Sequence, residues 1–499
     1  MTHAPPGSAN VLTRPGIRSA TGIARSMRDV DHAVTSLRDF HTSFAAYRDT
    51  ERSRIRHIPF TELQGWRFAE SSGNLVHDSG RFFSVQGLRV HDAPGGVPSW
   101  EQPVIHQPEV GVLGILVKEF DGIPHCLMQA KMEPGNHNGV QLSPTVQATR
   151  SNYTRVHGGR AVPYLDYFRN AARHHVLADV LQSEQGSWFY RKRNRNIVVE
   201  TTEDVELLDG FYWLSVGQLH ALLAVDDLVN MDARTVMSCL PLTDPASPGF
   251  GSPGGDPRSP YPVEDDTVRS SLARSLDPGH GALHPLGAVR NWISGVRAEF
   301  DGRAELVDLG AIGGWHRSAE RLSHESGLFF DVMAVDVRTG SREIGGWTQP
   351  MIEARGRGVV AFLVQRIDGV LHALTRVKHE AGFMDAVELA PTVQCTPENY
   401  TVLPPEAAPP FLDEVLHAPA DAIRFDSVLS EEGGRFFHTR SRYLIVEVPA
   451  GRELRAPEDF RWLTAHQLSG LVQHSNYLNI QARSLLACLH SLLRQTRGE

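Results

Sequence analysis

The chain has 499 residues, and its 49 Lys and Arg against 58 Asp and Glu give a formal net charge of −9. This acidic balance argues against a general nucleic-acid binder, and a hydrophobic content of 41% excludes a mostly disordered chain. At roughly 150 residues per domain, the length predicts two to four domains.

The predicted elements occur in the same order in both halves of the chain. Sequence patterns predict two strands joined by an Asp-Gly hairpin turn, a helical segment, a short β-rich run and two further helices. In the first half these are 111–120, 125–132, 164–181, 196–200, 214–227 and 233–240, and in the second half 358–367, 372–379, 411–418, 444–448, 463–476 and 482–489. Each half is therefore predicted to be α+β, with helices packed on a sheet.

Whole motifs recur 247 residues apart, as Trp100 and Trp347 show. WEQPVI at 100–105 returns as WTQPMI, and QLSPTVQATRSNY at 141–153 returns as ELAPTVQCTPENY. SEQGSWFYRKRNRNIVVE at 183–200 returns as SEEGGRFFHTRSRYLIVE. Such a period is too long for a solenoid, so the sequence predicts a duplicated domain.

The repeat sets the expected domain boundaries. We expect an N-terminal tail and helix at 1–57, the first repeat at 58–240, a Pro/Gly/Ser-rich linker at 241–285 and the second repeat at 286–499. Residues 1 to about 30 share the composition of the linker and are predicted to be a loose tail.

Polar uncharged side chains share one face of the segment 141–153. Gln, Ser and Thr occupy every second position from Gln141 to Ser151, and an extended chain places them on one side. Hydrogen-bonding groups without charge suit a sugar or a nucleobase. The alternative is an ordinary solvent-facing strand.

A basic cluster follows three aromatic residues in SWFYRKRNRN. Arg193 and Arg195 share a strand face, and the second repeat keeps Arg440 and Arg442 at the matching positions. Guanidinium groups match phosphate oxygens, so the cluster is a candidate diphosphate clamp. The alternative is a solvated basic strand or an ion-pair network.

Two further pairs of matched residues suit catalysis or stacking. Trp66 and Trp315 each follow a glycine and offer a flat surface for a base, although a core position is the alternative. Lys131 with Glu133, and Lys378 with Glu380, project from one side of a strand and are acid and base candidates. The alternative for each is a structural Lys–Glu pair.

Several signatures are absent from the sequence. There is no GxGxxG after a predicted strand, no GxxxxGK[ST] loop, no HExxH and no GxSxG. The four cysteines form no CxxC pair, which indicates reduced thiols rather than disulfides or a zinc site. No apolar run approaches the roughly 18 residues of a membrane helix, and the N-terminus lacks a signal-peptide pattern, so we expect a cytoplasmic protein without a membrane partner.

A resemblance to a known family rests on the duplication and on the motifs WEQPVI, QAKMEPGN, VQLSPTVQATRSNY, QSEQGSWFYRKRNRN and GWTQPMI. In these features the chain resembles the NDP-hexose 2,3-dehydratases of deoxysugar biosynthesis. The resemblance implies two tandem Nudix-like α/β/α sandwich domains, each with a nucleotide-sugar pocket, in a homodimer with one catalytic pocket per chain. The Nudix box is missing from both repeats, and with it the glutamates that hold divalent cations, so we expect no metal.

The implied substrate is dTDP-4-dehydro-6-deoxy-α-D-glucose, which would lose its C2 hydroxyl by deprotonation at C3 and β-elimination. This chemistry is redox-neutral within one molecule and implies no cofactor. A downstream NADPH-dependent 3-ketoreductase would act on the unstable product. The rivals are a metal-dependent NDP-sugar hydrolase of the Nudix type and a non-catalytic nucleotide-sugar binding protein.

The resemblance also implies site residues. Lys131, Glu133 and Tyr153 are the catalytic candidates. The expected substrate contacts are Trp66, Thr149, Arg150, Ser151, Asn152, Tyr153, Arg193, Arg195, Trp315, Lys378, Thr396, Pro397, Glu398, Asn399, Tyr400, Arg440 and Arg442. The first repeat is favoured as the working site because Pro397 replaces Arg150 in the second. His379 in place of Met132 is a possible base there and argues the other way.

Overall fold

A computed structural model describes residues 15–28, 30, 33–150, 161–242, 267–279, 281–340 and 344–494. Its α-helices are α1 (Pro15–Arg28), α2 (Leu37–Thr50), α4 (Leu165–Arg169), α5 (Val216–Leu222), α6 (Met231–Met237), α7 (Val268–Ser275), α8 (Leu286–Ala298), α9 (Leu412–Leu416), α10 (Ala465–Val472) and α11 (Ile480–Ser491). Short 3₁₀ helices are η1 (Phe60–Glu62), η2 (Ala171–Arg173), η3 (Leu309–Ala311), η4 (Pro397–Thr401), η5 (Pro405–Ala407) and η6 (Ala420–Ala422).

Each half of the chain forms a seven-stranded sheet. The first has the order β10-β11-β6-β7-β12, with β8 beside β7 and β9 beside β6. Its strands are β6 (Gly111–Phe120), β7 (Ile123–Met132), β8 (Val140–Ser143), β9 (Val146–Ala148), β10 (His175–Ser183), β11 (Arg193–Glu200) and β12 (Phe211–Ser215). The second has the order β20-β19-β18-β23-β22, with β21 beside β18 and β24 beside β19. Its strands are β18 (Gly358–Ile367), β19 (Val370–His379), β20 (Val387–Pro391), β21 (Val393–Cys395), β22 (Ile423–Ser430), β23 (Arg440–Val448) and β24 (Phe460–Thr464).

The predicted hairpins are confirmed. Asp121 and Gly122 join β6 to β7 with φ of 51° and 79°, and Asp368 and Gly369 join β18 to β19 with φ of 50° and 77°. Two successive positive φ angles match the right-handed twist of the flanking strands, and Asp-Gly is the sequence that tolerates them.

The helix predicted over 164–181 is wrong in its second part. Helix α4 ends at Arg169, and residues 175–183 form β10, which pairs antiparallel with β11. The free backbone edge of β11 decides the outcome, because tertiary pairing overrides a weak local helical pattern. The predicted helices at 411–418, 214–227, 463–476, 233–240 and 482–489 are present as α9, α5, α10, α6 and α11.

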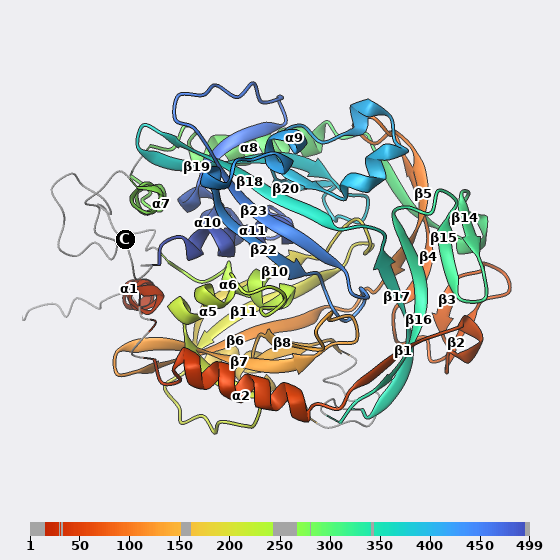
Figure 1. The fold of residues 1–499 in the computed structure, drawn as a ribbon, viewed down its shortest axis with the longest axis horizontal. Helices are drawn as coiled ribbons and strands as arrows, with labels where there is room; N and C mark the ends of the chain where they lie inside the picture. The colour runs from red at the N-terminus through yellow and green to blue at the C-terminus, as the bar shows by residue number, and fades with distance from the viewer. Residues whose placement is uncertain are drawn as a thin grey trace, which may run out of the picture.

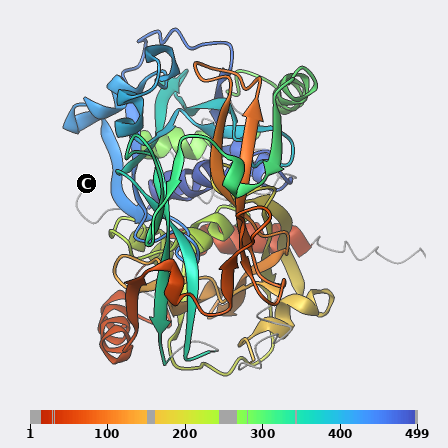
Figure 2. The same cartoon turned by 90° about the vertical axis from the view of Figure 1, so that its right-hand side faces the viewer.

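Two smaller sheets exchange a strand between the halves of the chain. One has the order β13-β4-β3-β2 with β5 beside β4, and the other has β1-β16-β15-β14 with β17 beside β16. Their strands are β1 (Arg54–Ile58), β2 (Trp66–Phe68), β3 (Leu75–His77), β4 (Ser84–His91), β5 (Trp100–His106), β13 (Arg303–Val307), β14 (Trp315–Arg317), β15 (Arg321–His324), β16 (Phe330–Arg338) and β17 (Gly346–Ala354). Strand β1 therefore pairs with β16 of the second half, and β13 with β4 of the first, as Figure 2 shows.

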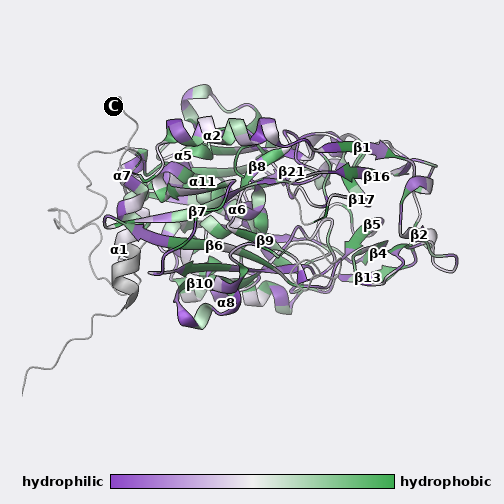
Figure 3. Ribbon diagram, turned by 90° about the horizontal axis from the view of Figure 1, so that it is seen from below, coloured by the Kyte–Doolittle hydropathy of each residue, from purple (hydrophilic) through white to green (hydrophobic). Residues whose placement is uncertain are grey.

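The core runs through both halves without a break. Helices α5, α6, α10 and α11 lie between the two seven-stranded sheets (Figure 1), and their apolar side chains belong to one buried cluster. Two fully buried arginines cross the contact: Arg234 donates to the carbonyl of Ser430 at 2.8 Å, and Arg483 donates to that of Ser183 at 2.5 Å. Green apolar colour runs along the strands in Figure 3.

The structure departs from the expected tail and linker. Helix α1 lies within the predicted tail and buries Ile23 and Met27, and α7 lies within the predicted linker and buries Leu272. Ser26 and Ser275 make matched hydrogen bonds, to the carbonyls of Pro124 and Leu371. The composition concealed these helices because each contributes only a short apolar stripe to the core.

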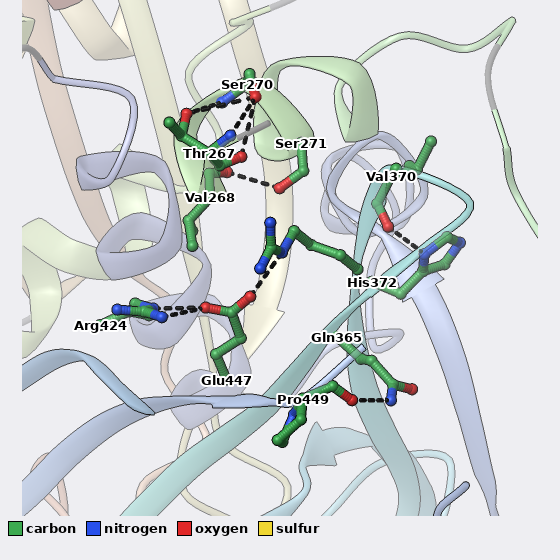
Figure 4. A network of polar contacts seen from close by, with 12 residues as sticks. Thr267, Val268, Ser270, Ser271, Gln365, Val370, His372, Arg424, Glu447 and Pro449 are labelled. Atoms are coloured by element: carbon green, nitrogen blue, oxygen red, sulfur yellow. Dashed lines mark hydrogen bonds and ion pairs between the residues drawn. The ribbon is translucent and has the colours of Figure 1, made fainter. Parts of the chain in front are cut away.

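Local polar contacts fix the ends of these elements. Thr267 and Ser270 form a capping box at the start of α7, and Glu447 on β23 accepts hydrogen bonds from Arg366 and Arg424 (Figure 4).

Among the described residues, no helix is long and apolar enough to cross a membrane.

Candidate active site

Two cavities are each lined by both halves of the chain. The first, of about 350 Å³, joins residues of β6, β9 and β11 to Trp347, Thr348, Gln349, Glu432, Gly434 and Arg435 of the second half. The second, of about 610 Å³, joins residues of β18, β21 and β23 to Trp100, Glu101, Gln102, Gln185, Ser187 and Trp188 of the first half. Each cavity is therefore composite.

The repeated Trp-x-Gln-Pro motif contacts a loop of its own repeat, and motif and loop together line the cavity of the other repeat. Gln349 donates to the carbonyl of Gly434 at 2.7 Å, and Gln102 donates to that of Ser187 at 2.6 Å. In each motif the indole N–H in turn donates to the glutamine side-chain oxygen. The motif thus fixes the wall of the opposite cavity.

The two predicted tryptophans lie on the two cavity walls. Trp66 lines the first and donates its indole N–H to the carbonyl of Thr348 at 3.0 Å, while Trp315 lines the second and donates to that of Glu101 at 2.9 Å. Both are mostly buried, and the Trp66 and Phe83 ring centroids are 4.8 Å apart. Each indole is consequently held in a fixed orientation.

Charged side chains gather on the wall of the first cavity. They are Glu133 after β7, Glu184 after β10, Lys192 before β11, Asp232 on α6, and Glu432 and Arg435 from the second half. Glu133, Glu184, Lys192 and Asp232 are almost wholly buried, whereas Glu432 and Arg435 are partly buried. Buried ionisable groups of both signs in a cavity are typical of sites where protons are transferred.

Burial shifts the proton affinities of this cluster towards neutral pH. It raises the pKa of Glu184 and, helped by neighbouring carboxylates, that of Asp232. It raises the pKa of Glu432 to about 7 and lowers the pKa of Lys192 to about 8. Groups with such pKa values are suited to general acid and base catalysis.

A chain of polar contacts leads from Glu133 to helix α6. Lys131 lies 3.6 Å from Glu133 and donates to the carbonyl of Gln147. The amide of Gln147 donates to Glu133 and accepts from Asn230, whose side chain caps α6. The second half repeats the lysine–glutamate, glutamine–glutamate and asparagine–glutamine contacts with Lys378, Glu380, Gln394 and Asn479. The Lys–Glu pair is therefore common to both cavities and does not distinguish them.

The other ionisable positions do distinguish the cavities. In the aligned repeats, Thr439 stands where Lys192 does, Gln481 matches Asp232, Gln185 matches Glu432 and Trp188 matches Arg435. Burial also lowers the pKa of His379, on the second wall, to about 4, so this imidazole is a weak base. The first cavity is the chemically richer one.

The structure distributes the other predicted residues between the two cavities. Thr149 lines the first, and Trp315, Lys378, Thr396, Asn399 and Tyr400 line the second. Arg150 is exposed, and neither it nor Pro397 and Glu398 lie on a described wall. Ser151, Asn152 and Tyr153 lie outside the described residues. Lys131 lies behind Glu133 rather than on the wall.

The predicted diphosphate arginines do not meet at either cavity. Arg195 forms an ion pair with Asp179 at 2.6 Å and Arg442 forms one with Asp426 at 2.6 Å, while Arg440 contacts Asp227. Arg193 is likewise absent from both walls. Arg193 and Arg195 do share one face of β11, as predicted. The first cavity, however, is lined by Lys192 and Asn194, whose positions alternate with those of the two arginines along the chain.

Sequence reasoning missed Glu184, Asp232, Glu432 and Arg435, and it noted Lys192 only as a member of the basic cluster. Loss of charge at the matched position would have revealed Lys192, Asp232, Glu432 and Arg435, whereas Glu184 is matched by Glu431 and gives no such signal. Of the residues that the structure describes, no group of three or more His, Cys, Asp or Glu is arranged to hold a metal ion.

Comparison with known proteins gives one consistent family. The model of the NDP-hexose 2,3-dehydratase family matches residues 37–240 and 286–489. A dTDP-4-dehydro-6-deoxy-alpha-D-glucopyranose 2,3-dehydratase of Saccharopolyspora spinosa is 48% identical, with 97% of this chain and 99% of the relative covered. Proteins of the same name from Amycolatopsis orientalis and Streptomyces violaceoruber are each 46% identical, covering 96% and 92% of this chain and 95% and 98% of their own. The chain belongs to the NDP-hexose 2,3-dehydratase family.

Proposed function

We propose that this protein is a dTDP-4-dehydro-6-deoxy-α-D-glucose 2,3-dehydratase, a hydro-lyase of deoxysugar biosynthesis for glycosylated natural products. The observation that carries the proposal is the end-to-end similarity to three relatives of that name, at 46–48% identity over 92–97% of the chain. The cluster of buried acids and cations in the first cavity supports it, because the reaction needs an acid and a base in one site.

The reaction follows from the C4 ketone. The ketone acidifies the proton on C3, and a base removes it to give an enolate. The enolate electrons then form the C2–C3 double bond as the C2 hydroxyl leaves with a proton from a general acid. The enol product tautomerises to a 3,4-diketo-2,6-dideoxy sugar, so no external oxidant or reductant is required.

The first cavity is the proposed working site. Glu133 is the proposed base, since it lies on the wall and is held by Lys131 and Gln147. Trp66, which lines the same cavity, is the proposed stacking surface for the thymine or the sugar. Lys192 and Arg435 supply positive charge for the C4 oxygen and the diphosphate. Tyr153 remains an oxyanion candidate from sequence.

Finer features of the family likeness are also proposals. Helices on both faces of the first seven-stranded sheet, α6 on one and α4 on the other, support a Nudix-like α/β/α sandwich. A homodimer, a cytoplasmic location and a downstream NADPH-dependent 3-ketoreductase complete the proposal.

The decisive experiment incubates the purified protein with dTDP-4-dehydro-6-deoxyglucose, alone and with an NADPH-dependent 3-ketoreductase as a trap. Mass spectrometry should show loss of one water with the diphosphate intact, and NADPH should be consumed only when the reductase is present. Unchanged sugar would refute the proposal and leave a binding protein.

The same assay with EDTA separates the rival hydrolase. A Nudix-type hydrolase needs divalent cations, so chelation would abolish its activity and its product would be a cleaved diphosphate. We expect dehydration to continue in EDTA. Metal-dependent release of a nucleoside monophosphate would favour the hydrolase.

A further inference from the structure

Asp232 is a buried carboxyl on the wall of the first cavity. It lies in the first turn of α6, its side chain is 5% exposed, and its Oδ1 has no hydrogen-bond partner. A buried polar atom without a partner costs free energy that a hydrogen bond to a bound ligand would recover. A polar group kept in this state beside a cavity is suited to meet a ligand there.

The surroundings favour the protonated form of this carboxyl. Burial is the largest cause of its raised pKa, and Glu184, Glu432 and Glu133 raise it further, whereas Lys131 lowers it. The nearby cation Lys192 interacts with Glu184. Burial first, and then the neighbouring carboxylates, raise the pKa of Asp232 well above its ordinary value and so favour the protonated form, which is able to donate a proton.

The second cavity supplies a natural comparison. Gln481 occupies the matching position on α11, is also buried, and also has an unpartnered side-chain oxygen on the cavity wall. Asn479 caps α11 as Asn230 caps α6, and the glutamine that contacts each cap is retained as well. The asparagine cap and its glutamine partner are thus common to both repeats. The carboxyl of Asp232, however, is replaced by the amide of Gln481, which cannot act as a proton source.

We propose that Asp232 is the general acid that protonates the departing C2 hydroxyl, and that Gln481 leaves the second cavity without this step. The assignment rests on the proposed function. The proton of Asp232 goes to the C2 oxygen as the C2–O bond breaks, the enolate electrons form the C2–C3 double bond, and water leaves. The base that holds the C3 proton then returns it to Asp232, so protons balance over one turnover.

The test separates the two halves of the reaction in Asp232→Asn. Elimination from dTDP-4-dehydro-6-deoxyglucose should fall about 10²- to 10⁴-fold, the usual contribution of a general acid. Exchange of the C3 hydrogen with solvent deuterium, which needs only the base, should persist above the rate without enzyme. Persistent exchange also demonstrates that the variant is folded and binds substrate.

A second substrate makes the acid role specific. In the 2-deoxy-2-fluoro analogue the leaving group is fluoride, which departs without a proton, so Asp232→Asn should process it within about tenfold of the wild type. Asp232→Glu, which restores a carboxylic acid, should regain part of the activity on the natural substrate. Asp426→Asn, the same change at the exposed Arg442 ion pair, is the matched control and should retain normal elimination.

Each outcome decides the proposal. Loss of C3 exchange together with elimination in a variant of normal thermal stability would make Asp232 the base instead. Unchanged elimination, or equal loss with the fluoro analogue, would exclude it as the acid. A wild-type protein that neither exchanges C3 nor loses water would instead refute the proposed function.

Discussion

The main-chain amide of Gly135 donates a 2.7 Å hydrogen bond to the carbonyl of Gly433 in the other repeat. Gly382 repeats this contact with Gly186 at 2.8 Å. These glycines end the Glu-Pro-Gly and Glu-Ala-Gly motifs, which begin with the buried carboxylates Glu133 and Glu380. The repeated motif therefore joins a cavity residue to the contact between the two halves.

The first prediction concerns this close approach. A Cβ added to Gly135 would lie 1.8 Å from the carbonyl oxygen of Phe436, so Gly135→Ala must displace backbone. We expect a loss of about 3 kcal/mol or more in the free energy of unfolding, measured by urea titration. Gly295→Ala in α8, where a Cβ would meet nothing within 4 Å, is the control and should stabilise by about 0.5–1 kcal/mol. Similar effects from both variants would show that the contact is loose.

Local sequence patterns predicted several strands and helices, whereas the pairing of strands from different halves depends on neighbours in space. The Asp-Gly turns and alternating residues predicted β6, β7, β18 and β19 because strand period and turn chemistry are local. The exchange of β1 and β13 depends on which sheet edge is free, which no local pattern records.

The site was predicted in part for the same reason. Trp66, Glu133 and Thr149 do line the first cavity. Strand period showed that Arg193 and Arg195 share a face, but the face that meets the cavity is set by distant elements. Glu432 and Arg435 reach the first cavity from the other repeat, and an offset between repeats does not reveal contacts across them.

The second prediction concerns stability and pH. Burial raises the pKa of Glu388 to about 7, and its carboxylate accepts a 2.6 Å hydrogen bond from Ser183. Because the folded-state pKa lies above the unfolded one, the contribution of Glu388 is fully present below about pH 4.5 and is lost as pH rises to about 7.

Glu388→Gln should remove this pH dependence. The matching residue of the first repeat is already Gln141, which accepts a 2.7 Å hydrogen bond from Ser430, so the amide should fit. Relative to wild type, the variant should gain up to roughly 3 kcal/mol between pH 4.5 and pH 8 in urea titrations. An equal slope in both proteins would contradict the raised pKa.

The third prediction separates two kinds of arginine. Arg435 lies on the wall of the first cavity above the Phe83 ring, whereas Arg195 forms a half-exposed ion pair with Asp179. We expect Arg435→Ala to raise KM at least tenfold. Arg195→Ala should leave KM unchanged and cost about 0–1 kcal/mol in stability. A larger KM effect at Arg195 would restore the diphosphate role that the sequence suggested.

The fourth prediction compares the two matched lysines. Lys131 holds both Glu133 and the carbonyl of Gln147 in the first half, and Lys378 holds Glu380 in the second. If the first cavity is the working site, Lys131→Ala should reduce kcat at least tenfold more than Lys378→Ala, with thermal melting of each variant as the control. A greater loss at Lys378 would move the working site to the second cavity.

The fifth prediction tests the dependence of the halves on each other. Strand β1 pairs with β16 and β13 with β4, and the buried Arg234 and Arg483 donate across the same contact. Expressed alone, fragments 1–250 and 251–499 would each expose the sheet edge that the other's strand occupies, and each would leave a cavity incomplete. We expect the separate fragments to aggregate or self-associate without activity. Coexpressed fragments should copurify as a one-to-one complex with dehydratase activity, because the exchanged strands and both cavity walls are then restored. An active, monomeric first fragment would show that Glu432 and Arg435 are dispensable and that the first cavity works without the second repeat.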